Sequence, residues 1–290
     1  MSSRGDSRKP QRGPLDRQRT VKYPCGLCGD RRRLTRTHIP PQCAGNTGLV
    51  ARQSIRLGSG RMDVGPPRVG GIHFYGLCEP CNNLGSRYDG AYKLLSQGLQ
   101  SLWIKDDSLR VPDLLALPDF SFRPGAVARS LVLSMFGVSP LLSERWPEFA
   151  HAMRTDADVV ELPQGLTLFL ALARGRRARV AGPISGFEVM TPHAPGDGRR
   201  PGFDGVVEVF FPPLAWRLVH ATDHNVLAEQ GWSDVSHWLS IPAHSVLPLH
   251  RELRSLPAVW YPRHGPDQGE GWVELLASTI TVISEADLPS

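Results

Sequence analysis

Two pairs of cysteines with the spacing Cys-x-x-Cys are the residues of this sequence best suited to bind a metal. They are Cys25 with Cys28 and Cys78 with Cys81. Four thiolates in two such pairs are common ligands of a tetrahedral structural zinc, and they leave no open position on the ion for water. We therefore predict one zinc ion that fastens the two pairs together and takes no direct part in catalysis.

Two residues close to these pairs could carry out chemistry. His38 lies between the pairs, and Asn82 directly follows the second pair. An imidazole accepts a proton near neutral pH, and an amide oxygen suits a hard cation such as Mg²⁺ or Mn²⁺. Hydrolysis of a phosphodiester needs a base that activates water and a cation that neutralises charge on the phosphate. We predict that His38 is the base and that Asn82 helps to hold the cation. The alternatives are a packing role for His38 and a helix-capping role for Asn82.

Local patterns predict the elements that would position these side chains. Residues 33–38 are typical of a strand, which must end at residues 40–41 because two prolines neither continue a helix nor donate to a β-ladder. Residues 44–71 contain many Gly and Pro, which indicates a long loop with one hairpin inside it. Residues 72–77 are expected to return as a second strand. Apolar side chains then recur at helical spacing, which predicts a helix over residues 83–102.

The order strand, loop, strand and helix, with these residues in it, resembles the zinc-stabilised branch of the HNH, or ββα-metal, nuclease family. The matching positions are Cys25, Cys28, Thr37, His38, Cys78, Cys81 and Asn82. The run Thr-His-Ile-Pro-Pro-Gln is also similar to the Asp-His-x-Pro-Pro-Lys of a widespread bacterial HNH group. The resemblance covers residues 23–103 and implies an endonuclease in which His38 is the general base and Asn82 holds a catalytic Mg²⁺ or Mn²⁺. It also implies DNA as the substrate, and a role in restriction or phage defence would suit such a protein.

One position departs from the family pattern. The family has a metal-binding Asp before the His, whereas this chain has Thr37, and a neutral hydroxyl is a poorer Mg²⁺ ligand than a carboxylate. Asp89, on the predicted helix after Asn82, is the best substitute in the chain, and an exposed helix charge is the other interpretation of it. If no group replaces the missing carboxylate, the chain is a zinc-stapled nucleic-acid-binding protein that cleaves weakly or not at all.

Charge is divided unevenly along the chain. Residues 1–100 contain 17 Lys and Arg against 6 Asp and Glu, whereas residues 101–290 contain 16 against 22. A basic N-terminal third favours binding to a nucleic-acid backbone and makes that binding depend on salt. DNA is the expected partner, with RNA as an alternative. The candidate phosphate-binding residues are Arg31, Arg32, Arg33 and Arg36. A solvated surface is the other interpretation of these arginines.

We expect an α+β fold in three parts. These are a flexible basic arm at residues 1–22, a zinc-stapled ββα-metal (HNH-like) domain at residues 23–103, and a larger α+β domain of unclear type at residues 104–290. In the last part, helices are predicted at residues 127–137 and 142–153, and strands at residues 166–172, 179–181, 187–190, 206–211 and 216–219. It contains no recognisable catalytic motif, so it could bind a ligand, a protein partner or a second copy of the chain, or select the nucleic acid.

Several features favour the cytoplasm. The longest apolar stretches, residues 130–138 and 166–173, are too short to span a bilayer, and the N-terminus is basic without the apolar stretch of a signal peptide. Four of the five cysteines lie in zinc-type pairs, which fits a reducing compartment better than a disulfide framework. The fifth, Cys43, is expected to be a buried free thiol, with substitution for a metal ligand as the alternative. We therefore expect a cytoplasmic protein without a membrane partner.

Overall fold

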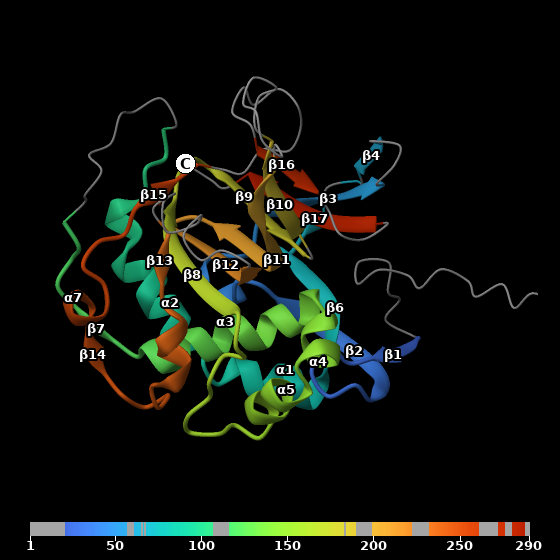
Figure 1. The fold of residues 1–290 in the computed structure, drawn as a ribbon, viewed down its shortest axis with the longest axis horizontal. Coiled ribbons are helices and arrows are strands. Elements are labelled where there is room, and N and C mark those ends of the chain that lie inside the picture. The colour runs from blue at the N-terminus through green and yellow to red at the C-terminus, as the bar shows by residue number, and fades with distance from the viewer. Residues whose placement is uncertain are drawn as a thin grey trace, which may run out of the picture.

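The computed structural model describes residues 21–56, 61–64, 66, 68–106, 116–182, 184–189, 199–221, 232–260, 272–275 and 280–287. Within these ranges the chain has a mixed α/β fold, with a small sheet, a large sheet and helices that pack against both (Figure 1). The expected basic arm lies almost entirely outside the described residues. No helix in the described ranges is long and apolar enough to cross a membrane.

The small sheet contains the two strands that were predicted around the cysteine pairs. Its order is β1-β2-β6, with β1 at Lys22–Pro24, β2 at Arg31–His38 and β6 at His73–Cys78, and both pairings are antiparallel. His38 lies opposite His73 in this register. β1 pairs with only the first three residues of β2. The rest of β2 therefore has one edge that β1 does not cover.

The predicted helix after the second cysteine pair is present, but it starts earlier and is divided in two. α1 spans Glu79–Ser86 and α2 spans Asp89–Gly98. The two residues between them bind a carboxylate from a distant turn: the Tyr88 hydroxyl donates to Asp156, and the Arg87 guanidinium lies 3.2 Å from the same side chain. These tertiary contacts fix the break, which helical periodicity alone does not reveal.

The long loop holds the expected hairpin and also joins a second sheet. β3 (Leu49–Arg56) pairs with β4 (Arg61–Val64), which confirms the hairpin, and β5 (Arg68–Val69) pairs with the start of β3. On its other side β3 pairs with β17 (Ile280–Asp287). Strands from opposite ends of the described chain are therefore neighbours.

The large sheet has twelve strands in the described ranges. Its main path is β13-β8-β12-β11-β9-β17-β3-β4, with β5, β10, β15 and β16 attached to it. The bounds of the strands from the C-terminal half are β8 Leu166–Ala173, β9 Arg177–Ala181, β10 Ile184–Val189, β11 Arg199–Phe211, β12 Leu214–Ala221, β13 Ser233–Asp234, β15 Ala258–Val259 and β16 Trp272–Leu275. The strands predicted in this half are confirmed, except that residue 190 lies outside the described residues.

One helix is buried along its whole length. α3 spans Pro124–Val138, and all 15 of its residues are buried. It lies between the small sheet with α1 and α2 on one side and the large sheet on the other (Figure 1). The periodicity of this segment predicted a helix, and the structure extends it toward the N-terminus, where Pro124 occupies the first position without a lost hydrogen bond.

The second helix predicted in the C-terminal half is divided. α4 spans Leu141–Arg145 and α5 spans Pro147–Arg154, because Pro147 has no N–H to continue α4 and instead begins α5. The other short elements are η1 Gln42–Ala44, η2 Gln100–Leu102, β7 Ser121–Phe122, η3 Ser236–Ser240, β14 Leu247–Pro248 and α7 Leu249–Glu252.

Buried side chains from both sides of the predicted boundary at residue 103 form one hydrophobic cluster. It contains Phe74 and Leu95 from the N-terminal part together with Leu131, Phe136 and Trp216 from the C-terminal part. The Trp216 indole also donates a hydrogen bond of 3.1 Å to the buried Tyr92 hydroxyl. The elements around the cysteine pairs are thus held by packing against α3 and the large sheet.

Two glycines permit this packing. A Cβ added to Gly26 would lie 1.9 Å from the carbonyl oxygen of Phe136, and a Cβ added to Gly76 would lie 1.9 Å from that of Gly137. No real side chain tolerates such a distance to a backbone atom. The turn between the first two cysteines and the bulged part of β6 therefore touch the C-terminal end of α3 directly.

We expect Gly76→Ala to lower the free energy of unfolding by about 1–3 kcal/mol, because β6 and α3 must separate to accept the methyl group. Thermal and urea unfolding would measure the loss. Gly90→Ala is the matched control, since a Cβ there meets nothing within 4 Å and alanine is the better helix former. Equal stability of the two variants would contradict the close contact.

Candidate metal centre and adjoining cavity

The four paired cysteines lie together. Cys25 and Cys28 lie in the turn between β1 and β2, Cys78 ends β6, and Cys81 lies in the first turn of α1. Their sulfur atoms all lie within 4.8 Å of one another, and Cys28 Sγ is 3.8 Å from Cys78 Sγ. A tetrahedral zinc with Zn–S bonds of about 2.3 Å places its ligand sulfurs roughly 3.8 Å apart. The group could therefore bind a metal ion such as zinc.

The four thiols differ in how readily they lose a proton. A hydrogen bond from the Cys81 thiol lowers the pKa of Cys25 to about 5, with help from backbone N–H groups such as that of Cys78 at 3.3 Å. The same bond and the nearby negative charge raise the pKa of Cys81, and burial raises the pKa of Cys28 to about 11. One thiolate is thus favoured without a metal, and a divalent cation is needed to hold four.

The fifth cysteine does not belong to this group. Cys43 lies in η1 and is exposed, so the expectation that it is buried is wrong, and it is not part of the four-cysteine cluster. Its Sγ donates to the backbone oxygen of Asp89 at 3.5 Å. Cys43 therefore helps to close a cavity on the other side of α1.

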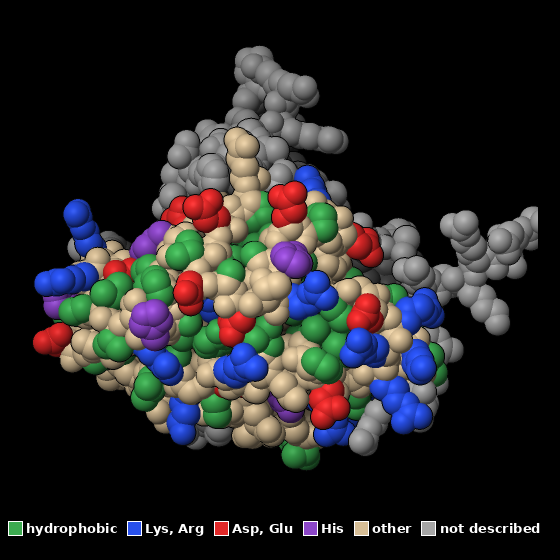
Figure 2. Space-filling view, turned by 90° about the horizontal axis from the view of Figure 1, so that it is seen from below, with side chains coloured by type: hydrophobic (Ala, Val, Ile, Leu, Met, Phe, Trp, Pro, Cys, Tyr) green, Lys and Arg blue, Asp and Glu red, His purple; other side chains and the backbone are tan. Residues whose placement is uncertain are grey.

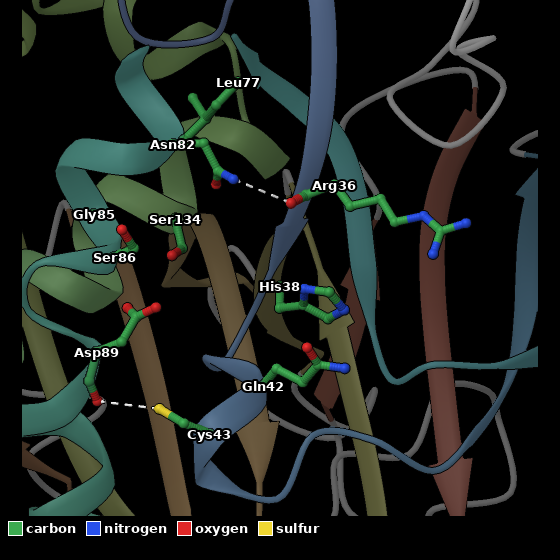
Figure 3. A pocket seen from close by; sticks show the side chains of 10 residues that line it. All are labelled: Arg36, His38, Gln42, Cys43, Leu77, Asn82, Gly85, Ser86, Asp89 and Ser134. Carbon is green, nitrogen blue, oxygen red and sulfur yellow. Dashed lines mark hydrogen bonds between the residues drawn. The ribbon is translucent and has the colours of Figure 1, made fainter. Parts of the chain in front are cut away.

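This cavity has a volume of about 340 Å³ and contains the three residues proposed for catalysis (Figure 3). Its lining residues are Arg36, His38, Gln42, Cys43, Leu77, Asn82, Gly85, Ser86, Asp89 and Ser134. In Figure 3, Arg36 and His38 of β2 lie to the right, and the residues of α1, α2 and α3 lie to the left. The structure thus brings His38, Asn82 and Asp89 to the same cavity, beside the four-cysteine group.

His38, the last residue of β2, is oriented by a backbone carbonyl. Its Nε2 lies 3.0 Å from the oxygen of Gly70. Because a carbonyl only accepts, this contact assigns the proton to Nε2 and makes Nδ1 the nitrogen that can take up a proton. Burial lowers the pKa of His38, so the ring is neutral at pH 7. In Figure 3 the ring lies across the β2 ribbon from Asn82 and Asp89.

Asn82 is hydrogen-bonded to the part of β2 that β1 does not cover. Its Nδ2 donates to the backbone oxygen of Arg36 at 3.2 Å. This bond uses the amide nitrogen and leaves Oδ1 as the end of the side chain that faces the cavity. α1 begins after Cys78 and has no side-chain cap, so the capping interpretation of Asn82 is wrong.

Asp89 begins α2 and is partly buried, so it is not the exposed helix charge of the alternative interpretation. Its Oδ1 accepts a hydrogen bond of 2.9 Å from the Ser130 hydroxyl of α3. Burial raises the pKa of Asp89, and the bond from Ser130 partly offsets this effect. The helix N-terminus also favours the ionised carboxylate.

Thr37 points away from the cavity. It alternates along β2 with Arg36 and His38 and therefore lies on the opposite face of the strand. Its side chain is 3% exposed, is directed toward Gly137 of α3, and its Oγ1 has no hydrogen-bond partner among the described residues. A carboxylate at this position of this strand would be buried in the core.

The four candidate phosphate-binding arginines of β2 are exposed. Arg32 forms a surface ion pair of 2.9 Å with Asp30, and the Nε of Arg36 donates to the Tyr75 hydroxyl at 3.2 Å. In Figure 2, Lys and Arg side chains are more closely spaced toward the right-hand edge, the side on which β1 and β2 lie in Figure 1, with acidic side chains among them. The exposed arginines are available for a polyanion, although Arg32 already pairs with Asp30.

Sequence reasoning missed the contribution of α3 to the cavity. Ser130 and Ser134 lie one turn apart on the largely apolar helix α3, Ser130 bonds to Asp89, and Ser134 lines the cavity. Two serines four residues apart in a largely apolar helix were the available signal. The carbonyl of Gly70 was also missed, because no motif marks which backbone atom a histidine will meet.

Comparison with known proteins adds no relative: no model of a protein family, no curated protein and no solved structure matches this chain.

We expect the purified protein to contain one zinc ion per chain, and Cys28→Ser to lose it. The melting temperature should fall by several degrees, because each 1 kcal/mol of lost stability lowers it by about 2–4 °C in a chain of this size. Elemental analysis and thermal unfolding measure the two effects. Cys43→Ser, outside the cluster, should retain both the metal and the melting temperature. Full metal content in Cys28→Ser would rule out the proposed ligand set.

Proposed function

We propose that this protein is a metal-dependent endonuclease of HNH type that hydrolyses phosphodiester bonds of DNA, with a structural zinc on the four cysteines. The observation that carries the proposal is that His38, Asn82 and Asp89 line one cavity. The antiparallel strands β2 and β6 and the helix α1 that follows them frame this cavity, and the four cysteines join their ends. This is the arrangement that the sequence resemblance to the ββα-metal family implies.

His38 is the proposed general base. Its Nε2–H is held by the Gly70 carbonyl, so Nδ1 is the acceptor for a proton from water. The electron pair of the resulting hydroxide attacks phosphorus, the bond from phosphorus to the leaving sugar oxygen breaks, and this oxygen keeps the electron pair and takes a proton from water. A Mg²⁺ or Mn²⁺ ion, when bound, would neutralise charge on the phosphate during this step. Asn82 Oδ1 and Asp89 are the residues that would hold it.

The position of the ring constrains the substrate. The imidazole and the carboxylate of Asp89 lie on opposite sides of the β2 ribbon in Figure 3. A phosphodiester that contacts both the imidazole and the carboxylate must therefore lie over the edge of β2 between Arg36 and His38. β1 does not cover this part of the strand, and the edge is accessible through the cavity. The exposed arginines of β2 would bind flanking phosphates, which predicts binding that weakens as salt rises.

A second function is favoured by one observation, the buried Thr37. The residue that stands in place of the family's Asp faces α3 and not the cavity. If Asp89 and Asn82 do not hold a cation strongly enough, the protein is a zinc-stapled nucleic-acid-binding module without cleavage. Salt-sensitive DNA binding with no nicking in Mg²⁺ or Mn²⁺ would favour this function, and clean nicking by the unmodified protein would exclude it. Parallel assays with RNA decide between the two nucleic acids.

Cleavage of plasmid DNA in Mg²⁺ or Mn²⁺ should depend on pH through His38. Because burial lowers the pKa of His38, the rate should rise with pH up to an apparent pKa below 6.5 and stay level above it. His38→Ala should lower the rate by about 10²–10⁴-fold. Nicking rates from pH 5 to 8 measure both effects.

His151→Ala removes an exposed histidine in the last turn of α5 and serves as the control. A His38→Ala protein that keeps its zinc and cuts DNA as fast as the wild type would show that His38 is not the general base.

Substitution of Thr37 should affect stability and not restore activity. Thr37→Asp would bury an unpaired carboxylate against α3 and should lower the free energy of unfolding by about 3–5 kcal/mol. Thr37→Val removes a hydroxyl without a described partner and should stay within about 1 kcal/mol of the wild type. Urea unfolding and the nicking assay test both variants. A stable Thr37→Asp protein with increased cleavage would show that this side chain reaches the site after all.

A further inference from the structure

Oxygen atoms from three helices line one wall of the cavity beside α1. They belong to Asn82 and Ser86 of α1, Asp89 of α2 and Ser134 of α3. Figure 3 shows these four side chains on the same side of the cavity, facing strand β2. We propose that α3 completes the seat of the divalent cation that Asn82 and Asp89 would hold, with Ser134 as a further ligand and Ser130 as a positioning residue. The proposal deepens the function proposed above, on which its catalytic meaning rests.

Both serines present oxygen lone pairs to the cavity. The Ser86 hydroxyl donates its hydrogen to the carbonyl of Asn83 at 2.8 Å, and the Ser134 hydroxyl donates to the carbonyl of Ser130 at 2.9 Å. A hydroxyl has one hydrogen and two lone pairs, so a hydroxyl that donates to its own helix can offer only acceptor positions to the cavity. Such an oxygen suits a cation and not an anion.

Asn82 and Asp89 also direct oxygen atoms toward the cavity. The side-chain nitrogen of Asn82 donates a hydrogen bond to the backbone of β2, which leaves the side-chain oxygen directed to the cavity. Asp89 is held through Oδ1 by Ser130, and no described residue donates to its Oδ2. Ser130 is fully buried, so the carboxylate is oriented by a rigid group. The wall therefore offers four acceptor groups, one of them an anion.

The charge of the wall predicts how tightly a cation binds. Asp89 is the only carboxylate among the lining residues, and the guanidinium of Arg36 extends away from the wall in Figure 3. Mg²⁺ in proteins is commonly held by one or two carboxylates, several waters and the phosphates of the substrate. We expect weak binding to the protein alone and tighter binding once a phosphodiester supplies further oxygens. Because Ser130 and Ser134 belong to residues 104–290, the site also requires the C-terminal part of the chain.

Titration of the zinc-loaded full chain with Mn²⁺, followed by the electron paramagnetic resonance signal of free Mn²⁺, tests the seat without reference to cleavage. Asp89→Asn keeps the shape of the side chain and should weaken binding by at least about tenfold, because it removes the only charge among the ligands. Ser134→Ala should weaken binding a few-fold. Glu148→Gln, which neutralises an exposed carboxylate in the first turn of α5, should leave binding unchanged.

A variant that binds Mn²⁺ more tightly gives a second test, which works even if the wild type binds Mn²⁺ weakly. Ser86 is exposed at the end of α1, so Ser86→Asp adds a carboxylate to the wall without burying it and should tighten Mn²⁺ binding by about tenfold. Asn83→Asp adds the same charge to the same helix at an exposed residue that does not line the cavity, and should change binding little.

The outcomes separate this inference from the proposed function. Equal Mn²⁺ affinity in the wild type and Asp89→Asn, or no binding by either the wild type or Ser86→Asp, would overturn the seat whether or not the protein cuts DNA. Binding that follows the expected order of variants supports the seat. If DNA then stays uncut in Mn²⁺, the inference stands and the nuclease function fails.

Discussion

The convergence of four sulfur atoms within 4.8 Å is the constraint on which the rest of the cavity depends. These atoms come from a turn, a strand end and the first turn of a helix. A single divalent ion would hold them together through four bonds. With the ends of β2, β6 and α1 fixed there, the other end of β2 and the C-terminal part of α1 diverge enough to leave a cavity between them.

Close packing against α3 is a second constraint. Backbone atoms of the first cysteine turn and of β6 lie against the last residues of α3 with no room for a Cβ. α3 is apolar over most of its surface and is covered on every side. The same helix carries Ser130 to the carboxylate of Asp89. The metal group and the cavity therefore depend on a helix that begins only at Pro124, well beyond both cysteine pairs in the sequence.

Sequence predicted the local features of this arrangement well. The spacing of the cysteines, the strand that ends at the two prolines and the strands of the C-terminal half depend on short-range rules, and the structure confirms them. The break between α1 and α2 was not predictable, because it depends on Asp156, which reaches Arg87 and Tyr88 only after folding. The direction of Thr37 was predictable in principle, since alternate residues of a strand face opposite sides. The parts that sequence could not supply are contacts between distant segments, such as that of His38 with Gly70 and that of Asp89 with Ser130.

The place of β17 in the large sheet has a consequence for synthesis of the protein. β17 is inserted between β3 and β9, so both strands lack a neighbour until residues 280–287 have left the ribosome. Segments emerge in order, and unpaired strand edges invite association with other chains, so this edge of β3 stays unpaired while the segment between Arg56 and Ile280 is synthesised. Completion of this sheet therefore has to wait for β17. Premature termination before β17 would leave an open edge in the middle of the molecule.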